Sequence, residues 1–67
     1  MSVAKVTEIS ATSATSIEDA IAHGIDRAGK TLDNISGAWV GEIKCDVVDG
    51  KVTNYRVNMR VTFVLND

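Results

Sequence analysis

The chain lacks most of the features that stabilise very small proteins. It has 67 residues, no proline, one cysteine (Cys45) and one histidine (His23). A single cysteine excludes an internal disulfide, and one cysteine with one histidine does not complete a structural zinc site. A domain of this length buries only about 60% of the surface that its unfolded chain exposes. The sequence therefore predicts one domain over residues 1–67 that is stabilised by association with other subunits.

Charge and hydrophobic runs exclude further classes of protein. The formal net charge is −2 and the pI is about 5.1, which argues against a nucleic-acid binder with a basic face. No apolar run approaches the ~20 residues that span a membrane, and the first residues lack the apolar core of a signal peptide. Together with a lone thiol, these absences predict a cytoplasmic protein that binds neither nucleic acid nor membrane.

The first half of the chain predicts a strand followed by a helix. Residues 3–9 are rich in β-branched side chains and predict a strand, and the small polar residues 10–15 predict a loop. Ser16 is a suitable N-cap, with two acidic residues in the following turn. Apolar residues then recur at helical spacing over 17–35, so we expect a helix of about 17 residues that ends at Asp33-Asn34. Gly24 lies on the apolar face of this helix, and we expect a close approach to the sheet there.

The second half predicts a hairpin of strands 38–48 and 51–65. A two-residue loop would pair Val48 with Lys51, whereas a three-residue loop with a left-handed glycine would pair Val47 with Lys51. From Ile43 to Val47 in one strand and from Tyr55 to Phe63 in the other, the apolar residues fall at odd positions. Only the pairing of odd with odd residues places them on one face, so the pattern favours the three-residue loop.

The alternation changes phase near Gly41. Ala38 and Val40 are apolar at even positions, and Ile43 is apolar at an odd one. A β-bulge at Gly41 would keep all three facing the helix and would turn Trp39 to the other face, beside the arginines of the last strand. Without the bulge, Trp39 lies beneath the helix as a core residue. Both alternatives remain open at this point.

The lengths of the predicted elements do not match. The helix would be about 25 Å long at 1.5 Å per residue, and the last strand about 50 Å at ~3.3 Å per residue. One helix cannot cover so long a strand, so either part of the apolar sheet face contacts another copy or the strand bends around one. An enzyme is not expected, because His23 and Cys45 lie on different elements and no nucleophile with its base can be named. Cys45 alternates with apolar neighbours and is expected in the core.

The order of elements and several residues resemble the dodecin family over nearly the full chain. The resemblance rests on Lys5-Val6, the Thr-Ser pair before the helix, Ala20-Ile21, Asp26-Arg27-Ala28, Thr31, Leu32-Asp33-Asn34 and the stretch from Tyr55 to Phe63. It implies an α+β subunit, β-α-β-β, whose three-stranded antiparallel sheet wraps around one helix. It also implies a non-catalytic homododecamer, a hollow shell of cubic symmetry that binds and stores flavins such as riboflavin or FMN. In the family, tryptophans stack on the flavin and a glutamine contacts its polar edge.

This sequence departs from the family at those two positions. The family tryptophan falls at Gly37 and the family glutamine at Arg56. Arg56 can donate a hydrogen bond to a flavin carbonyl but cannot accept one from a ring N–H. The candidate ligand site therefore consists of Gly37, Ala38, Trp39 and Arg56, with Trp39 either a displaced stacking platform or a packing residue.

Two alternatives to a flavin site follow from the same residues. Some dodecin-like proteins are associated with calcium, and Glu42 and Asp46, repeated around a symmetry axis, could gather such cations through carboxylate oxygens. The arginines of the last strand could instead hold phosphate-bearing ligands. A purely structural assembly with no small ligand is the remaining alternative.

Overall fold

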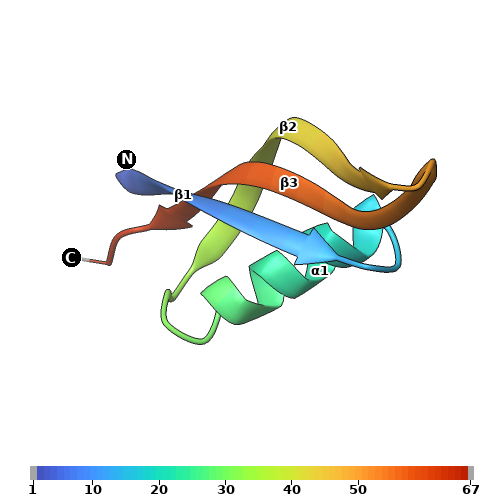
Figure 1. The fold of residues 1–67 in the computed structure, drawn as a ribbon. Helices are drawn as coiled ribbons and strands as arrows, with labels where there is room; N and C mark the ends of the chain where they lie inside the picture. Colours follow the sequence, from blue (N-terminus) through green and yellow to red (C-terminus); the bar gives the residue numbers. More distant parts are fainter. Residues whose placement is uncertain (1, 67) are drawn as a thin grey trace.

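The computed structural model describes residues 2–66 and has the predicted order of elements. The elements are β1 (Ala4–Ser13), α1 (Ile17–Ala28), β2 (Ile35–Val48) and β3 (Lys51–Val64). All strand pairs are antiparallel, and β3 lies between β1 and β2. Figure 1 shows the sheet curving over a single helix. The predicted α+β architecture is confirmed. Within residues 2–66, no helix is long and apolar enough to cross a membrane.

Strand β1 is longer than the sequence predicts. The expectation of a loop over 10–15 is wrong for its first four residues, because Ser10–Ser13 pair with Tyr55–Asn58 of β3. These small polar residues have little intrinsic preference for a strand. The long strand β3 nevertheless offers them a complete hydrogen-bonding partner, and this tertiary context overrides local propensity.

Ser13 organises the turn between β1 and α1. Its buried hydroxyl accepts a hydrogen bond from the backbone N–H of Thr15 at 2.9 Å and donates to Asp19 Oδ2 at 2.6 Å. Ser16 is the helix N-cap, as predicted, and its side chain accepts from the backbone N–H of Asp19 at 3.0 Å. The two serines together satisfy donors at the start of the helix that would otherwise lack partners.

Helix α1 ends earlier than expected, after 12 residues rather than about 17. Gly29 caps it, and the backbone N–H groups of Thr31 and Leu32 both donate to the carbonyl of Ala28, at 3.2 and 2.9 Å. The chain then leaves the turn through Asn34 in the left-handed conformation, with φ of 62°. This turn keeps Leu32 half-buried. The helical spacing of apolar residues therefore continues past the end of the helix itself.

The core lies between the helix and the sheet. Helix α1 packs mainly against β1 and β3, and the buried residues at its centre are Ala20, Val57 and Met59. Gly24 is the point of closest approach: a Cβ there would lie 2.7 Å from Met59 Cε and 3.0 Å from the Cβ of Ala11. The predicted reason for a glycine on the apolar face of the helix, a close approach to the sheet, is therefore confirmed.

The turn between β2 and β3 has two residues, not three as predicted. Asp49 and Gly50 both have positive φ, 51° and 76°, and Val48 pairs with Lys51. Positive φ at both central residues is typical of a type I′ turn, whose twist matches that of the flanking strands.

A bulge at Thr53 then restores the pairing of odd with odd residues. The register shifts between the pairs Asp46/Asn54 and Val47/Val52, and the Thr53 hydroxyl donates to the carbonyl of Asp46 at 3.2 Å. The predicted arrangement of the two faces is therefore correct, although the predicted turn is not.

A second bulge confirms one of the two alternatives for Trp39. The register shifts between the pairs formed by Val40 and Ile43, so that β2 has one extra residue at Gly41-Glu42. Trp39 therefore lies opposite Arg60 on the sheet face away from the helix, and it is not a core residue.

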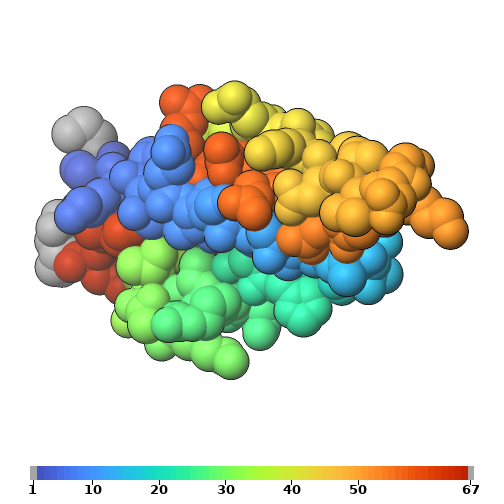
Figure 2. All heavy atoms as spheres, in the orientation of Figure 1, coloured from blue at the N-terminus to red at the C-terminus, as the bar shows by residue number. Residues whose placement is uncertain are grey.

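The helix leaves part of the sheet uncovered. On its side of the sheet, five residues of the hairpin form an exposed surface, here called the apolar stripe: Val40, Ile43, Cys45, Val47 and Val52. The expectation that Cys45 is a core residue is therefore wrong within one chain. Helix α1 is about 18 Å long and β3 about 46 Å, from the rise per residue. The molecule as a whole measures 52 × 19 × 13 Å. Figure 2 shows the hairpin end, in yellow and orange, extending past its other elements.

Candidate functional site

Trp39, Arg60 and Glu8 form a row across the sheet face that the helix does not cover. Trp39 is 58% exposed, and Arg60 lies opposite it on β3 with its guanidinium carbon 5.4 Å from the centroid of the indole ring. This distance is within the range of a cation–π interaction. On the other side of β3, Glu8 of β1 lies opposite Arg60. We call this surface the tryptophan face.

A shallow hollow of about 200 Å³ opens on the tryptophan face. Its polar lining side chains are Glu8, Glu42, Asn58 and Arg60, and Trp39 forms an aromatic wall. The bulge at Gly41 brings Glu42 beside this wall. The hollow thus combines an exposed ring with donors and acceptors, which is what a flat aromatic molecule with a polar edge requires.

The structure separates the four residues of the predicted ligand site. Gly37 lies opposite Thr62 and shares the face of Trp39, whereas Ala38 lies opposite the buried Val61, on the helix side of the sheet. Arg56 is four residues along β3 from Arg60, a separation of about 13 Å. Its guanidinium instead lies 3.8 Å from a carboxylate oxygen of Asp46. Only Gly37 and Trp39 of the four therefore lie close to each other on one face.

The sequence analysis misses Glu8 and places Arg60 beside Trp39 only in one of its two alternatives. The structure has the odd-with-odd register and the bulge at Gly41, which together place Arg60 opposite Trp39. No sequence pattern indicates Glu8, because its position beside Arg60 depends on how β1 pairs with β3.

The two candidate metal ligands are not brought together in one chain. Glu42 is exposed at the bulge, and Asp46 is engaged with Arg56. Within residues 2–66, no three His, Cys, Asp or Glu side chains lie close enough to hold a metal ion. A cation site built from Glu42 and Asp46 would therefore require several copies of the chain.

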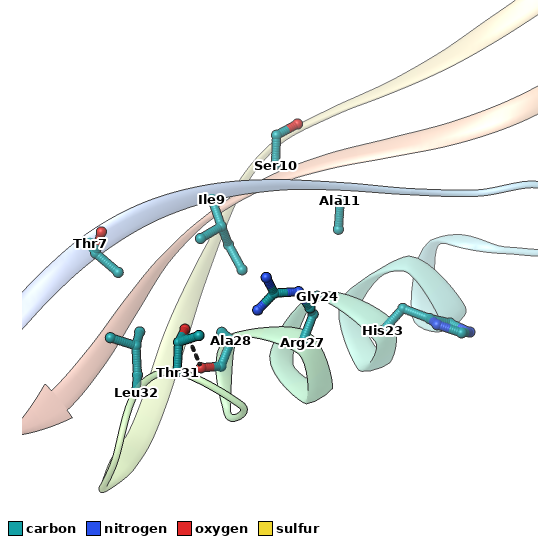
Figure 3. A pocket seen from close by; sticks show the side chains of 10 residues that line it. All are labelled: Thr7, Ile9, Ser10, Ala11, His23, Gly24, Arg27, Ala28, Thr31 and Leu32. Carbon is teal, nitrogen blue, oxygen red and sulfur yellow. Dashed lines mark hydrogen bonds between the residues drawn. The ribbon is translucent and has the colours of Figure 1, made fainter.

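A groove runs between α1 and β1 on the other side of the sheet (Figure 3). It encloses about 560 Å³, with an apolar floor that consists of Ile9, Ala11, Gly24, Ala28 and Leu32. His23 and Arg27 of the helix provide its basic side chains, and no acidic residue lines it. We call it the helix–strand groove. It lies at the β1 edge of the sheet, whereas the apolar stripe lies toward the β2 edge.

Ser13, Asp19 and His23 are close together but do not form a nucleophilic centre. The Asp19 carboxylate lies between the other two: Oδ2 accepts from Ser13, and Oδ1 lies 3.4 Å from His23 Nε2. Activation of a serine requires the imidazole, not the carboxylate, next to the hydroxyl. The cluster therefore stabilises the start of the helix.

The comparison with known families decides the identity of this fold. A family model described as Dodecin matches residues 3–66. The chain belongs to the dodecin family. Among solved structures, the dodecin from Streptomyces davaonensis is 35% identical over 98% of this chain and 97% of its own, with a TM-score of 0.93. A variant of the T. thermophilus dodecin is 33% identical over the whole of both chains, with a TM-score of 0.94. No curated protein matches the sequence.

A third dodecin structure differs more from this chain in shape but less in sequence. It is the calcium dodecin from Mycobacterium tuberculosis, described as a calcium-chelating antigen with a novel calcium-binding site. It is 38% identical over 96% of this chain and 91% of its own, with a TM-score of 0.81. The dodecin fold is thus found together with calcium in at least one relative.

Proposed function

We propose that this dodecin is a non-catalytic cytoplasmic homododecamer that binds a flat aromatic ligand of flavin type on its tryptophan face. The observation that carries the proposal is the exposure of Trp39 beside Arg60 on a sheet face that the helix leaves free. Covering a water-exposed aromatic side chain with another ring lowers the free energy, because apolar surface is removed from water.

The assembly is supported by the apolar stripe. Its members on β2 and β3 are exposed in the single chain, and exposed apolar patches of this kind mark protein interfaces. No element within residues 2–66 covers them. The number of twelve copies is the expectation from the family resemblance.

The hollow offers a flavin-type ring hydrogen-bond partners other than the family glutamine. Glu8 and Glu42 supply acceptors for a ring N–H, which Arg56 cannot do. Arg60 and Asn58 supply donors for ring carbonyls. Arg56, about 13 Å farther along β3, would contact the phosphate of FMN and not the ring.

Fluorescence titration tests the proposal directly. Trp39 is the only tryptophan, so its emission reports on this site alone. We expect riboflavin and FMN to quench Trp39 emission and to lose their own emission on binding. Trp39→Ala should abolish flavin quenching, whereas Trp39→Phe, which keeps a ring, should retain part of it. Full flavin emission in the presence of excess wild-type protein would refute the flavin-type ligand.

A second candidate is cation binding, which the calcium dodecin from M. tuberculosis favours. Here the exposed Glu42 carboxylates of several copies would provide the oxygen ligands. Asp46 would first have to leave Arg56. Calorimetric titration with calcium should give heat that Glu42→Gln abolishes and that Glu18→Gln, an exposed helix control, does not. Absence of heat in the wild type would remove this candidate.

A further inference from the structure

Glu42 is the carboxylate of the hollow on the tryptophan face that no basic residue faces across the sheet. The other carboxylate, Glu8, lies directly opposite Arg60, so a positive charge faces it. Glu42 falls within the bulge, where it has no residue directly opposite, and it forms no ion pair within residues 2–66. Its side chain is exposed and lines the hollow beside Trp39. Both of its carboxylate oxygens are therefore available to a ligand, and an ionised carboxylate only accepts hydrogen bonds.

A group that only accepts distinguishes between the edges of flat rings. The polar edge of a flavin ring presents one N–H between two carbonyl oxygens. If both carboxylate oxygens face this edge, one accepts from the N–H and the other lies against a carbonyl oxygen, which repels it. A glutamine amide, with one acceptor and one donor, matches the same edge. A ring with an N–H beside an exocyclic amino group instead donates to both carboxylate oxygens at once, as arginine does in a bidentate pair.

The size and charge of the hollow favour a small neutral ring. Its volume of about 200 Å³ lies below the range of about 300–1,000 Å³ that is usual for pockets of drug-sized ligands, so it suits two fused rings better than the three of a flavin. Two glutamates against one arginine leave the lining negative, which disfavours an anionic ring. The guanidinium of Arg60, 5.4 Å from the ring centroid of Trp39, disfavours a cationic one.

We infer that the tryptophan face prefers neutral two-ring heterocycles with a ring N–H beside an exocyclic amino group, as in pterins, and that Glu42 selects them. This inference rests on the proposed ligand site and specifies the class of ligand that the site takes. The ring stacks on Trp39, and Glu42 accepts from the two adjacent donors. Arg60 or Asn58, which line the same hollow, donates to the ring carbonyl next to the N–H.

Pterin and lumazine form a matched pair of probes for this preference. Both are two-ring pteridines, and they differ at one position of the polar edge, which carries an amino group in pterin and a carbonyl in lumazine. Equilibrium dialysis against the wild-type assembly at slightly acidic pH, where both rings are neutral, compares their affinities. A hydrogen bond to a charged group contributes enough that pterin should bind about tenfold more tightly, or better.

Glu42→Gln should reverse the preference. The glutamine amide has nearly the same shape but replaces one acceptor with a donor. The variant should therefore lose most of its affinity for pterin and gain affinity for lumazine and riboflavin. Glu8→Gln is the matched control, because it removes the same charge from the same lining and should keep the preference for pterin. Both glutamates are exposed, so neither change removes a buried contact.

The same dialysis measurements separate the possible failures. Equal affinity of the wild type for pterin and lumazine, or a preference that survives Glu42→Gln, would overturn the selection by Glu42 and leave the proposed ligand site intact. An equal loss of preference in Glu8→Gln would also overturn it, because net charge would then be the cause. No binding of pterin, lumazine or riboflavin would refute the ligand site itself. A preference for pterin that Glu42→Gln alone reverses supports both.

Discussion

Arg60 holds its guanidinium carbon 5.4 Å from the ring centroid of Trp39, directly across from it on the neighbouring strand. One side of the indole is therefore partly occupied by a cation, and Trp39 as a whole remains 58% exposed. The arginine also keeps the indole in a defined position, at a gain of about 0.5–1 kcal/mol for an exposed pair.

Replacement of Arg60 tests whether this pairing assists the ligand. We expect Arg60→Gln to weaken riboflavin and FMN binding alike, by about 2- to 5-fold, since 0.5–1 kcal/mol corresponds to that range. Arg56→Met, which removes the charge without introducing the family glutamine, is the control and should weaken FMN binding only, through loss of the phosphate contact. Titration of both ligands against both variants provides the comparison. Tighter binding to Arg60→Gln would mean that the arginine competes with the ligand for the ring.

Gly37→Trp should strengthen flavin binding. A Cβ at Gly37 would have no heavy atom within 4 Å, and the residue shares the face of Trp39. The new ring can therefore stack without disturbing the sheet. A stacked base gains about 1–3 kcal/mol from an aromatic side chain, so we expect affinity to rise by roughly 5- to 150-fold. Gly37→Leu, which adds apolar volume but no flat ring, should give much less. Equal gains from both variants would contradict stacking as the cause.

Gly24→Ala should lower the melting temperature of the assembly. The added methyl group gains about 1 kcal/mol of helix propensity, but it would lie 2.7 Å from Met59 Cε and 3.0 Å from the Cβ of Ala11. Overpacking of this kind costs about 1–3 kcal/mol, and the Cβ of a strand residue cannot move aside alone. Gly29→Ala is the control, because Gly29 has a φ of −64° and a Cβ there would lie no closer than 3.4 Å to any heavy atom outside its immediate neighbours. Thermal melts at one protomer concentration should show a loss for Gly24→Ala and little or none for Gly29→Ala.

Ser13→Ala should destabilise the fold by about 0.5–1.5 kcal/mol for each hydrogen bond lost, the usual net contribution of such a bond. It removes the acceptor of the Thr15 N–H and the donor to Asp19. Urea denaturation at fixed protomer concentration measures the effect, since the stability of an oligomer depends on concentration. Ser36→Ala, at an exposed position, should change the midpoint little. Identical midpoints for the two variants would show that the Ser13 hydrogen bonds contribute nothing.

The sequence predicted the fold well where a side-chain pattern has one physical meaning. The alternation in the hairpin required odd residues to pair with odd ones, and the phase change at Gly41 pointed to a bulge as one of two alternatives. Prediction from the sequence failed where one side-chain pattern is compatible with two structures. Leu32 keeps helical spacing although it lies in a turn, because the turn after Ala28 returns it to the same side of the sheet. The small polar residues after Ile9 suit a loop equally well, and only the length of β3 makes them a strand.

The site was predicted less completely, for a reason of geometry. Trp39 and Gly37 lie on one face because they are two residues apart on one strand. The placement of Arg60 and Glu8 depends instead on register between strands that are far apart in sequence. Arg56 was selected because it occupies the family position, yet its nearest charged partner is Asp46.

The bulge at Gly41 has a consequence for how this chain can change. Val40 and Ile43 lie three residues apart and still share a face, because the bulge absorbs one residue of the alternation. Removal of one residue between them would make the strand regular and would leave both side chains on the helix side, with Trp39 still on the tryptophan face. Loss of the bulge without a change in length would instead turn Trp39 toward the helix side and bring Val40 into its place. The extra residue is therefore a spacer that can be trimmed by one position without moving the tryptophan to the other face.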